Sequence, residues 1–375
     1  MSGSEDRFAA LAQPGIQRLK AYDPGHDLVA FRRKFGKHAL SELGSNENAH
    51  GPSPAARHAI LDALSGLFRY PDPLGGELKR ALAAQHGVTV EQILLGNGSH
   101  ELLMQFGQVF AGPGVDVVAS RYGFAVYALA AQAAGANLRL AEALPREAVM
   151  PRGHDTEALL AAVTPATRLL FFANPNNPTG TWFATADLVR LLERIPEHVV
   201  VVVDEAYIEF VDAPELESAL GLLARFPNLV ITRTFSKAYG LAGLRVGYAI
   251  ADSGLIAVME RVRESFNVNS LGLAGATAAL ADAAHLDWVC ARNAQERAWL
   301  RERLEQRGCF VHPSQTNFLL VEFGARTAEI ESSLTTRGVV LRPMGGYGLG
   351  DCLRITVGTR SESQRLLQAL DEVGA

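Results

Sequence analysis

Cysteine is scarce in this sequence, and its spacing argues against the functions that depend on paired thiols. The chain has 375 residues but only three cysteines, Cys290, Cys309 and Cys352, and no two of them form a C-x-x-C pair. An odd number without that spacing argues against a disulfide framework and against a thiol-bound zinc site. We therefore expect a cytoplasmic protein without a metal site.

Long apolar runs and an excess of basic charge are missing as well. The longest apolar stretches contain glycine or fall far short of the ~20 residues that a membrane span needs. The first residues show no basic segment followed by an apolar one, so we expect no signal peptide. The net charge of -5 argues against nucleic acid or a membrane as partner, since both select basic patches. A small anionic ligand stays open, because local arginines decide that.

What the sequence does contain is an alternation of short apolar runs and amphipathic segments from Ser53 onward. Four runs rich in β-branched residues predict buried strands, at 115–119, 168–172, 199–203 and 229–232. Three amphipathic segments predict helices, at 101–110, 125–135 and 186–194. Strands that alternate with helices predict βαβ units and a mainly parallel sheet flanked by helices.

The pattern changes after about Asn269. A long helical stretch at 271–303 is followed by three β-like segments, at 310–323, 339–342 and 352–357, and by a final helix after Ser361. This order predicts a second, smaller α+β domain. We expect an N-terminal arm (1–45) that joins the small domain, a large α/β domain (46–268) and a small C-terminal domain (269–375).

The first segment that suggests chemistry is Leu95–His100, LGNGSH, between a predicted strand and a predicted helix. Its glycines let the backbone approach a ligand closely. The N–H groups of Gly98, Ser99 and His100 at the start of the helix could then hold an anion such as a phosphate. A plain glycine-containing turn would have the same composition.

The second segment is Ala173–Gly180, ANPNNPTG, directly after a predicted strand. Two prolines and a glycine make a rigid loop that could aim Asn177 at a ligand oxygen. An ordinary turn between strand and helix is the alternative.

The third segment places Asp204 at the carboxyl end of the apolar run 199–203. A buried acid is costly unless it has a partner, and ligands of open α/β sheets bind at that end of the strands. Asp204 is therefore a candidate to pair with a buried cation, or else it caps the next helix.

The fourth segment runs from Thr234 to Tyr248 and contains Lys237 among small residues. A lysine held away from water loses its charge more easily, so it can act as nucleophile and base. Ser236 and Arg245 add a donor and a cation suited to a phosphate. A solvated lysine after a strand is the alternative.

Together, these segments meet the requirements of pyridoxal 5'-phosphate (PLP). Its aldehyde needs a lysine amine, its ring nitrogen a carboxylate, its phenolic oxygen a neutral donor, and its phosphate a helix start with Ser and Arg. Lys237, Asp204, Asn177 and the loop at Gly96–Ser99 supply them.

The chain resembles fold-type I PLP aminotransferases, and within them the histidinol-phosphate aminotransferases and their aromatic relatives. The resemblance runs nearly end to end. Besides the four segments above, it includes SNEN at 45–48, RYPD at 69–72, FNVN at 266–269, GGYGL at 345–349 and LRITVG at 353–358.

The resemblance implies a role for each cofactor residue. Lys237 would carry PLP as a Schiff base and shuttle the substrate proton, and Asp204 would pair with the ring nitrogen. Asn177 and Tyr207 would bond the phenolic oxygen, and Phe124 would stack on the ring. Gly98 and Ser99, with Ser236 and Arg245, would hold the phosphate.

The resemblance also implies how substrate and partner bind. Arg354 would take the anionic group of the substrate, the α-carboxylate of glutamate or the phosphate of histidinol phosphate. Arg342 and Tyr22 would assist. Tyr70 would reach the cofactor phosphate of a neighbouring subunit, so we expect a homodimer.

Three other functions stay open at this stage. An aromatic aminotransferase would keep the cofactor and change the substrate. A threonine-phosphate decarboxylase or a C–S lyase would change the reaction. A PLP-binding sensor domain would need a DNA-binding segment, which this sequence does not show.

Overall fold

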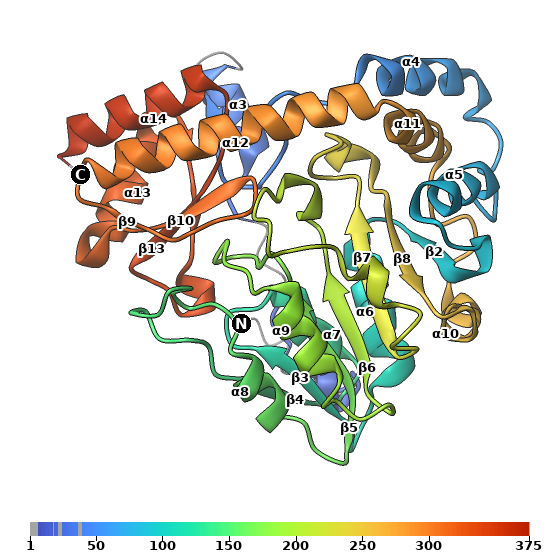
Figure 1. Cartoon of the computed structure of the whole chain (residues 1–375). Coiled ribbons are helices and arrows are strands. Elements are labelled where there is room, and N and C mark those ends of the chain that lie inside the picture. The colour runs from blue at the N-terminus through green and yellow to red at the C-terminus, as the bar shows by residue number, and fades with distance from the viewer. Residues whose placement is uncertain (1–6, 18, 22–24, 37–39, 375) are drawn as a thin grey trace.

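A seven-stranded sheet forms the larger part of the fold, in the order β2-β8-β7-β6-β5-β3-β4 (Figure 1). The computed structural model describes residues 7–17, 19–21, 25–36 and 40–374. Six strands of this sheet run in one direction, and β8 is antiparallel to both of its neighbours. The strands are β2 (Ile93–Gly96), β3 (Asp116–Ser120), β4 (Asn137–Ala141), β5 (Thr167–Ala173), β6 (Val200–Asp204), β7 (Leu229–Thr234) and β8 (Gly247–Ala251).

Helices cover both faces of this sheet because its strands alternate apolar side chains between the faces. In β6, Val202 packs with one helical layer, while Val201 and Val203 pack with the other. The first layer is α6 (Ser99–Phe110), α7 (Ala125–Ala133) and α10 (Ser253–Met259), and the second includes α8 (Thr156–Ala161) and α9 (Thr185–Leu192). A third apolar cluster joins β2 and β8 to α4 (Pro54–Ala63), α5 (Gly76–His86) and α11 (Ser270–Ala281).

A smaller four-stranded sheet follows in the chain, in the order β12-β13-β10-β9, with antiparallel pairs. Its strands are β9 (Phe310–Val311), β10 (Phe318–Glu322), β12 (Arg342–Pro343) and β13 (Cys352–Thr356). One face packs against α12 (Ala283–Glu305), α13 (Thr327–Thr336) and α14 (Arg360–Val373). Figure 1 shows α12 running along the top of the molecule from this sheet toward α11. The mainly parallel sheet and the smaller second sheet are thus both confirmed.

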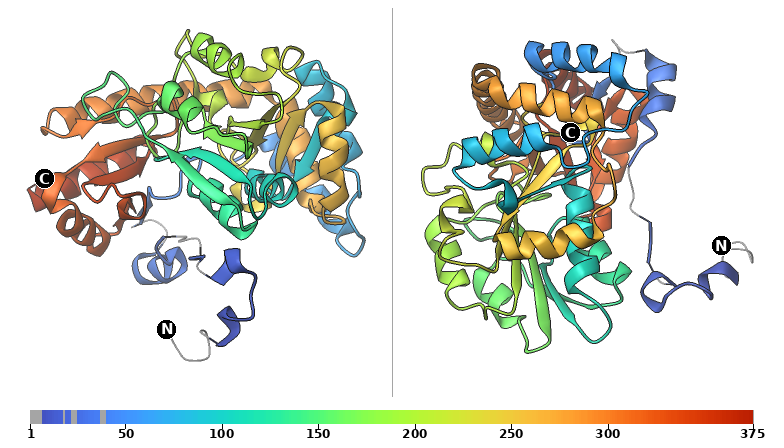
Figure 2. Two further views of the ribbon diagram at one scale, coloured as in Figure 1. Left: turned by 90° about the horizontal axis from the view of Figure 1, so that it is seen from below. Right: turned by 90° about the vertical axis from the view of Figure 1, so that its right-hand side faces the viewer.

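The N-terminal segment contacts both parts of the molecule. Its described residues lie outside the two sheets (Figure 2). Helix α2 (Pro14–Gln17) contacts α7, whereas β1 (Ser41–Glu42) pairs in parallel with β11 (Val339–Val340). Helix α3 (Leu28–Phe35) lies between them in the chain.

Two expectations about the second half of the chain were wrong in detail. The predicted helix at 271–303 is two helices, because the side chain of Asp282 accepts the N–H of His285 and so caps the start of α12. The predicted strand at 310–323 is broken between β9 and β10, where Pro313 has no N–H to donate to a ladder.

None of the helices in the described residues is both long enough and apolar enough to cross a membrane.

Candidate active site

A pocket of about 420 Å³ lies beside the carboxyl ends of β5, β6 and β7. Parallel neighbouring strands end at the same edge of a sheet, and Asp204 on β6 pairs in register with Thr232 on β7. Lys237 follows β7, so the two residues reach the same edge, as the sequence predicted. The pocket is lined by most of the expected residues: Ser99, His100, Phe124, Asn177, Asp204, Tyr207, Ser236, Lys237, Arg245 and Arg354.

Asp204 is a buried carboxylic acid at the end of β6. Its Oδ2 accepts the hydroxyl of Tyr127 at 3.0 Å, and its Oδ1 accepts the N–H of Ala206 at 3.2 Å. Burial raises the pKa of Asp204 to about 6, and these hydrogen bonds oppose that rise. The group is thus ionised near neutral pH and suited to a cationic partner in the pocket.

Lys237 lies partly buried in the same pocket. Its Nζ donates to the carbonyl oxygens of Ser45 at 3.3 Å and Asn46 at 3.2 Å. Burial, and then the charge of Arg354, lower the pKa of Lys237 to about 7. A large share of this amine is therefore neutral at neutral pH, as a nucleophile or a base requires.

One end of the pocket is built for an anion. Ser99 begins α6, and Gly98 before it has a φ of 84°. A Cβ on Gly98 would come within 2.4 Å of Nη2 of Arg245, so only glycine lets this guanidinium lie against the loop. Nη1 of Arg245 donates to the hydroxyl of Ser236 at 3.2 Å. Burial, and then Arg245, lower the pKa of His100, which keeps its ring neutral.

The lining of the pocket also includes an amide and a second arginine. Nη1 of Arg354 on β13 donates to Oδ1 of Asn177 at 2.7 Å, and its Nη2 donates to the carbonyl of Gly44 at 2.9 Å. Since the amide oxygen of Asn177 accepts, its NH₂ group is the end that can donate to a ligand. Burial raises the pKa of Tyr207, so its hydroxyl keeps its proton.

Two expected residues lie outside this pocket. Arg342 pairs in register with Arg354, but it lines a second pocket of about 410 Å³. Phe124 lines the first pocket and its neighbour Ala125 the second, so the two pockets adjoin. Tyr70 is 82% exposed and stacks on Phe266 at a centroid distance of 4.7 Å. Tyr22 lies outside the described residues.

Two residues of the site were missed by the sequence reasoning. Tyr127 donates to Asp204 and packs edge-on against Phe124 at 5.9 Å. Asn46 donates from Nδ2 to the hydroxyl of Tyr207 at 3.0 Å. Asn46 lies in the SNEN segment, and Tyr127 lies three residues after Phe124. The signal that could have identified Tyr127 is a tyrosine one helical turn after Phe124 on an otherwise apolar helix.

Comparison with known protein sequences gives full-length matches. The family model described as "Aminotransferase class I and II" matches residues 40–370. Histidinol-phosphate aminotransferase 2 of Pseudomonas aeruginosa is 45% identical over 98% of this chain and 98% of its own length. Its counterpart in Methylococcus capsulatus is 44% identical over 98% of this chain and 99% of its own.

Comparison with solved structures also gives matches over most of the chain. Histidinol-phosphate aminotransferase from Sinorhizobium meliloti, in complex with pyridoxal 5'-phosphate, has a TM-score of 0.86 and 32% identity, over 97% of both chains. Threonine-phosphate decarboxylase from Porphyromonas gingivalis has a TM-score of 0.75 over 89% of this chain and 99% of its own, but at 22% identity that likeness shows the fold alone.

The pKa of Lys237 predicts how stability depends on pH. Its folded pKa of about 7 lies below the ordinary value of 10.5. The charged lysine therefore destabilises the folded ligand-free protein fully below pH 7, and the cost fades as pH rises toward 10.5. Lys237→Met should raise the melting temperature at pH 6 by about 1–3 °C, and by less at pH 10. A gain of equal size at both pH values would contradict the buried position of the amine.

Proposed function

We propose that this chain, which belongs to the class I and II aminotransferase family, transfers the amino group of histidinol phosphate to 2-oxoglutarate with the aid of PLP. Full-length relatives with that name at 44–45% identity support the substrate. The PLP complex of the Sinorhizobium meliloti enzyme supports the cofactor. The proposal includes a place in histidine biosynthesis. It also includes a cytoplasmic location, which rests on the sequence argument alone.

One observation carries the proposal: Lys237, with a pKa of about 7, lines the same pocket as the buried carboxyl group of Asp204. A neutral amine suits the aldehyde of PLP, and a buried carboxylate suits its protonated ring nitrogen. The side chains present therefore fit the cofactor. Lys237 would bind it covalently through Nζ, and Asp204 would pair with the ring nitrogen.

The rest of the pocket fits the remaining groups of the cofactor. The start of α6 at Ser99, the hydroxyl of Ser236 and the guanidinium of Arg245 would hold the phosphate, with Gly98 and His100 shaping that end. Phe124 would stack on the ring. The NH₂ group of Asn177 and the hydroxyl of Tyr207 would donate to the phenolic oxygen.

When bound, PLP supplies an electron sink for the substrate carbon that carries the amino group. The side chains of this chain would do the rest. When Nζ of Lys237 is neutral and not bonded to the cofactor, it could accept the proton of that substrate carbon. It could then donate this proton to C4′ of the cofactor. Arg354 and Asn177 would orient the substrate by its anionic group, since both line the pocket beside Lys237.

Substrate binding would use both pockets. Glutamate brings two carboxylates, and histidinol phosphate brings a phosphate and no α-carboxylate. Arg354 would meet an anion of either substrate. Arg342, on the paired strand and in the adjoining pocket with Lys20, would add a second cation for a dianionic phosphate. Tyr22 is proposed to assist from the N-terminal arm, on the family resemblance alone.

The active protein is proposed to be a homodimer in which Tyr70 reaches the cofactor phosphate of the partner. Tyr70 is exposed and lies in a stretch that also exposes large apolar side chains: Leu61, Leu64, Leu67, Phe68 and Leu74. An exposed group of this kind marks an association surface.

The test of the function is a half-reaction screen of the PLP-loaded enzyme. Histidinol phosphate and glutamate should each abolish the absorbance of the lysine-bound cofactor, and phenylalanine should do so more slowly. A faster reaction with phenylalanine would favour an aromatic aminotransferase. Release of CO₂ from threonine phosphate without such conversion would favour a decarboxylase.

Arg342→Ala should separate the two substrate classes. We expect kcat/KM for histidinol phosphate to fall about tenfold to a hundredfold more than that for phenylalanine, because a charge-assisted bond to phosphate contributes about 1.5–3 kcal/mol. Arg354→Ala is the comparison and should damage both reactions. Equal losses in Arg342→Ala would exclude its phosphate role.

Tyr127→Phe should weaken PLP binding, because it removes a donor to Asp204 and keeps the ring that packs on Phe124. Without that bond the pKa of Asp204 rises further, and the ionised fraction falls. We expect the dissociation constant for PLP at pH 7 to rise about tenfold, and more at pH 6 than at pH 8. A dissociation constant that changes equally at both pH values would count against this role.

The shared site can be tested by mixing two inactive variants, Tyr70→Ala and Lys237→Ala. A mixed dimer has one site with both native residues, so co-refolded protein should recover about a quarter of wild-type activity. If mixed dimers form and remain inactive, Tyr70 does not serve the partner's site.

A further inference from the structure

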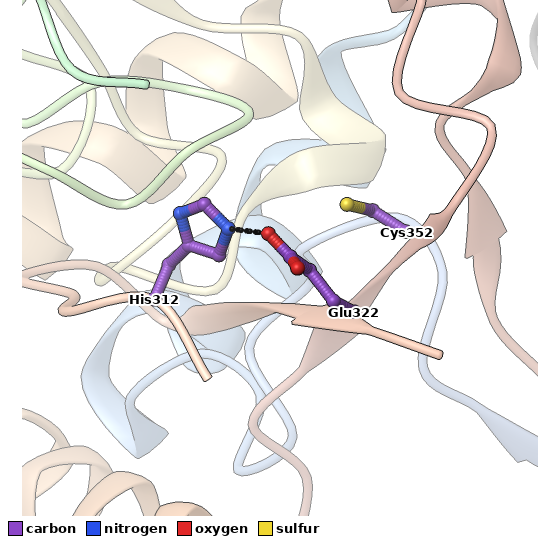
Figure 3. A group of neighbouring side chains, drawn as sticks. All are labelled: His312, Glu322 and Cys352. Atoms are coloured by element: carbon purple, nitrogen blue, oxygen red, sulfur yellow. Dashed lines mark hydrogen bonds and ion pairs between the residues drawn. The ribbon is translucent and has the colours of Figure 1, made fainter. Parts of the chain in front are cut away.

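A largely buried group of polar side chains lies outside both pockets, where β10 ends and β13 begins in the four-stranded sheet. It consists of His312 after β9, Glu322 on β10 and Cys352 on β13 (Figure 3). One nitrogen, one oxygen and one sulfur atom of these residues lie within 4.8 Å of one another. Imidazole, carboxylate and thiolate are the groups that bind zinc in proteins.

An arginine supplies the cation of this group. Nη1 of Arg152 donates to Oε1 of Glu322 at 2.7 Å and to Sγ of Cys352 at 3.2 Å, and it lies 3.5 Å from Nε2 of His312. Its Nη2 donates to Oδ2 of Asp351 at 3.1 Å. The guanidinium therefore occupies the position that a metal ion would need, and we propose no metal here.

The pKa shifts of the thiol and the imidazole agree with an arginine as the cation of this group. Burial raises the pKa of Cys352 to about 12, so its thiol keeps its proton and donates to Asp351 at 3.3 Å. Burial, and then Arg152, lower the pKa of His312. Its Nδ1 lies 3.2 Å from the carbonyl of Pro151, and its Nε2 lies 3.3 Å from Oε1 of Glu322 and 3.5 Å from Nη1 of Arg152 (Figure 3).

This cluster ties a loop of the larger sheet to the smaller one. Arg152 lies in the loop between β4 and α8, which reaches the strands of the four-stranded sheet (Figure 1). The loop is closed at its base, where Ala143 and His154 form a β-bridge, and His154 lies 2.9 Å from the carbonyl of Ala173 at the end of β5. The loop thus joins the end of β5, just before Asn177, to the start of β13, just before Arg354.

Strand β13 presents one face to the rest of the molecule. Alternate residues share a face, so Cys352, Arg354 and Thr356 point the same way. Each one is held: Cys352 by Arg152, Arg354 by Asn177 and the carbonyl of Gly44, and Thr356 by the backbone N–H of Asn46. Leu353 and Ile355 point to the apolar core under the helices.

We infer that Arg152 is a positioning residue for Arg354. Its guanidinium holds Cys352, the first residue of β13, two residues before Arg354. It thereby sets where Arg354 lies relative to Asn177. The inference rests on the proposed function in one respect, namely that Arg354 binds the anionic group of the substrate.

The test compares two arginines of one loop. Arg146 donates to Oε2 of the same Glu322 at 2.8 Å, but it is 43% exposed and this bond holds it to β10 rather than to β13. In the PLP-loaded enzyme, Arg152→Met should raise the KM for glutamate about tenfold and leave kcat within about twofold, since one charged hydrogen-bond network is lost. The matched control, Arg146→Met, should change neither. Arg152→Lys, which keeps the charge, should recover most of the wild-type KM.

A second measurement separates this inference from the proposed function. Amide hydrogen exchange of the peptide that contains residues 351–357 should be faster in Arg152→Met than in wild type or Arg146→Met, whatever the substrate proves to be. Unchanged hydrogen exchange in Arg152→Met would show that Arg152 does not hold β13 in place. Faster exchange with an unchanged KM, or a loss of kcat alone, would overturn the positioning role. Should Arg152→Met fail to fold, Arg152→Gln, which keeps a hydrogen-bond donor but loses the charge, answers the same question, with a KM and exchange equal to wild type as the contradicting result.

Discussion

The burial of an ionisable carboxyl group at the end of β6 is the constraint around which this structure is arranged. Asp204 is bound by neutral donors, the Tyr127 hydroxyl and the Ala206 N–H, and its pKa of about 6 leaves it charged at neutral pH. A buried charge of this kind is costly without a cation. In the proposed function the ring nitrogen of PLP is that cation, so the fold maintains at this position a charge that ligand binding compensates.

Lys237, in contrast to Asp204, is held largely in its neutral form. Burial and Arg354 push its pKa down, and two backbone carbonyls accept its hydrogen bonds. Two neighbouring strands, β6 and β7, position the ionised acid and the neutral amine. Their register places Asp204 opposite Thr232. The smaller sheet then contributes one side chain, Arg354, whose position depends on how β13 is held to the larger part.

The sequence was sufficient to predict strands β3, β5, β6 and β7 and the residues that follow β6 and β7, because β-branched runs and an acid or a lysine after a run are local signals. The runs before Asp204 and before Lys237 became β6 and β7, side by side. Local signals could not reveal contacts between distant segments. Arg152 meets Cys352 across 200 positions, and Tyr127 meets Asp204 across 77. The pocket that a side chain lines also could not be read from the sequence: Arg342 pairs in register with Arg354, yet it lines the adjoining pocket.

The most direct test of the central claim is to locate the cofactor on the chain. PLP-loaded protein would be reduced with borohydride, digested and mapped by mass spectrometry. The account predicts the added mass of reduced PLP on Lys237 alone, and its loss from that peptide when Asp204→Ala weakens the site. The added mass on a different lysine, with Lys237 unmodified, would contradict it.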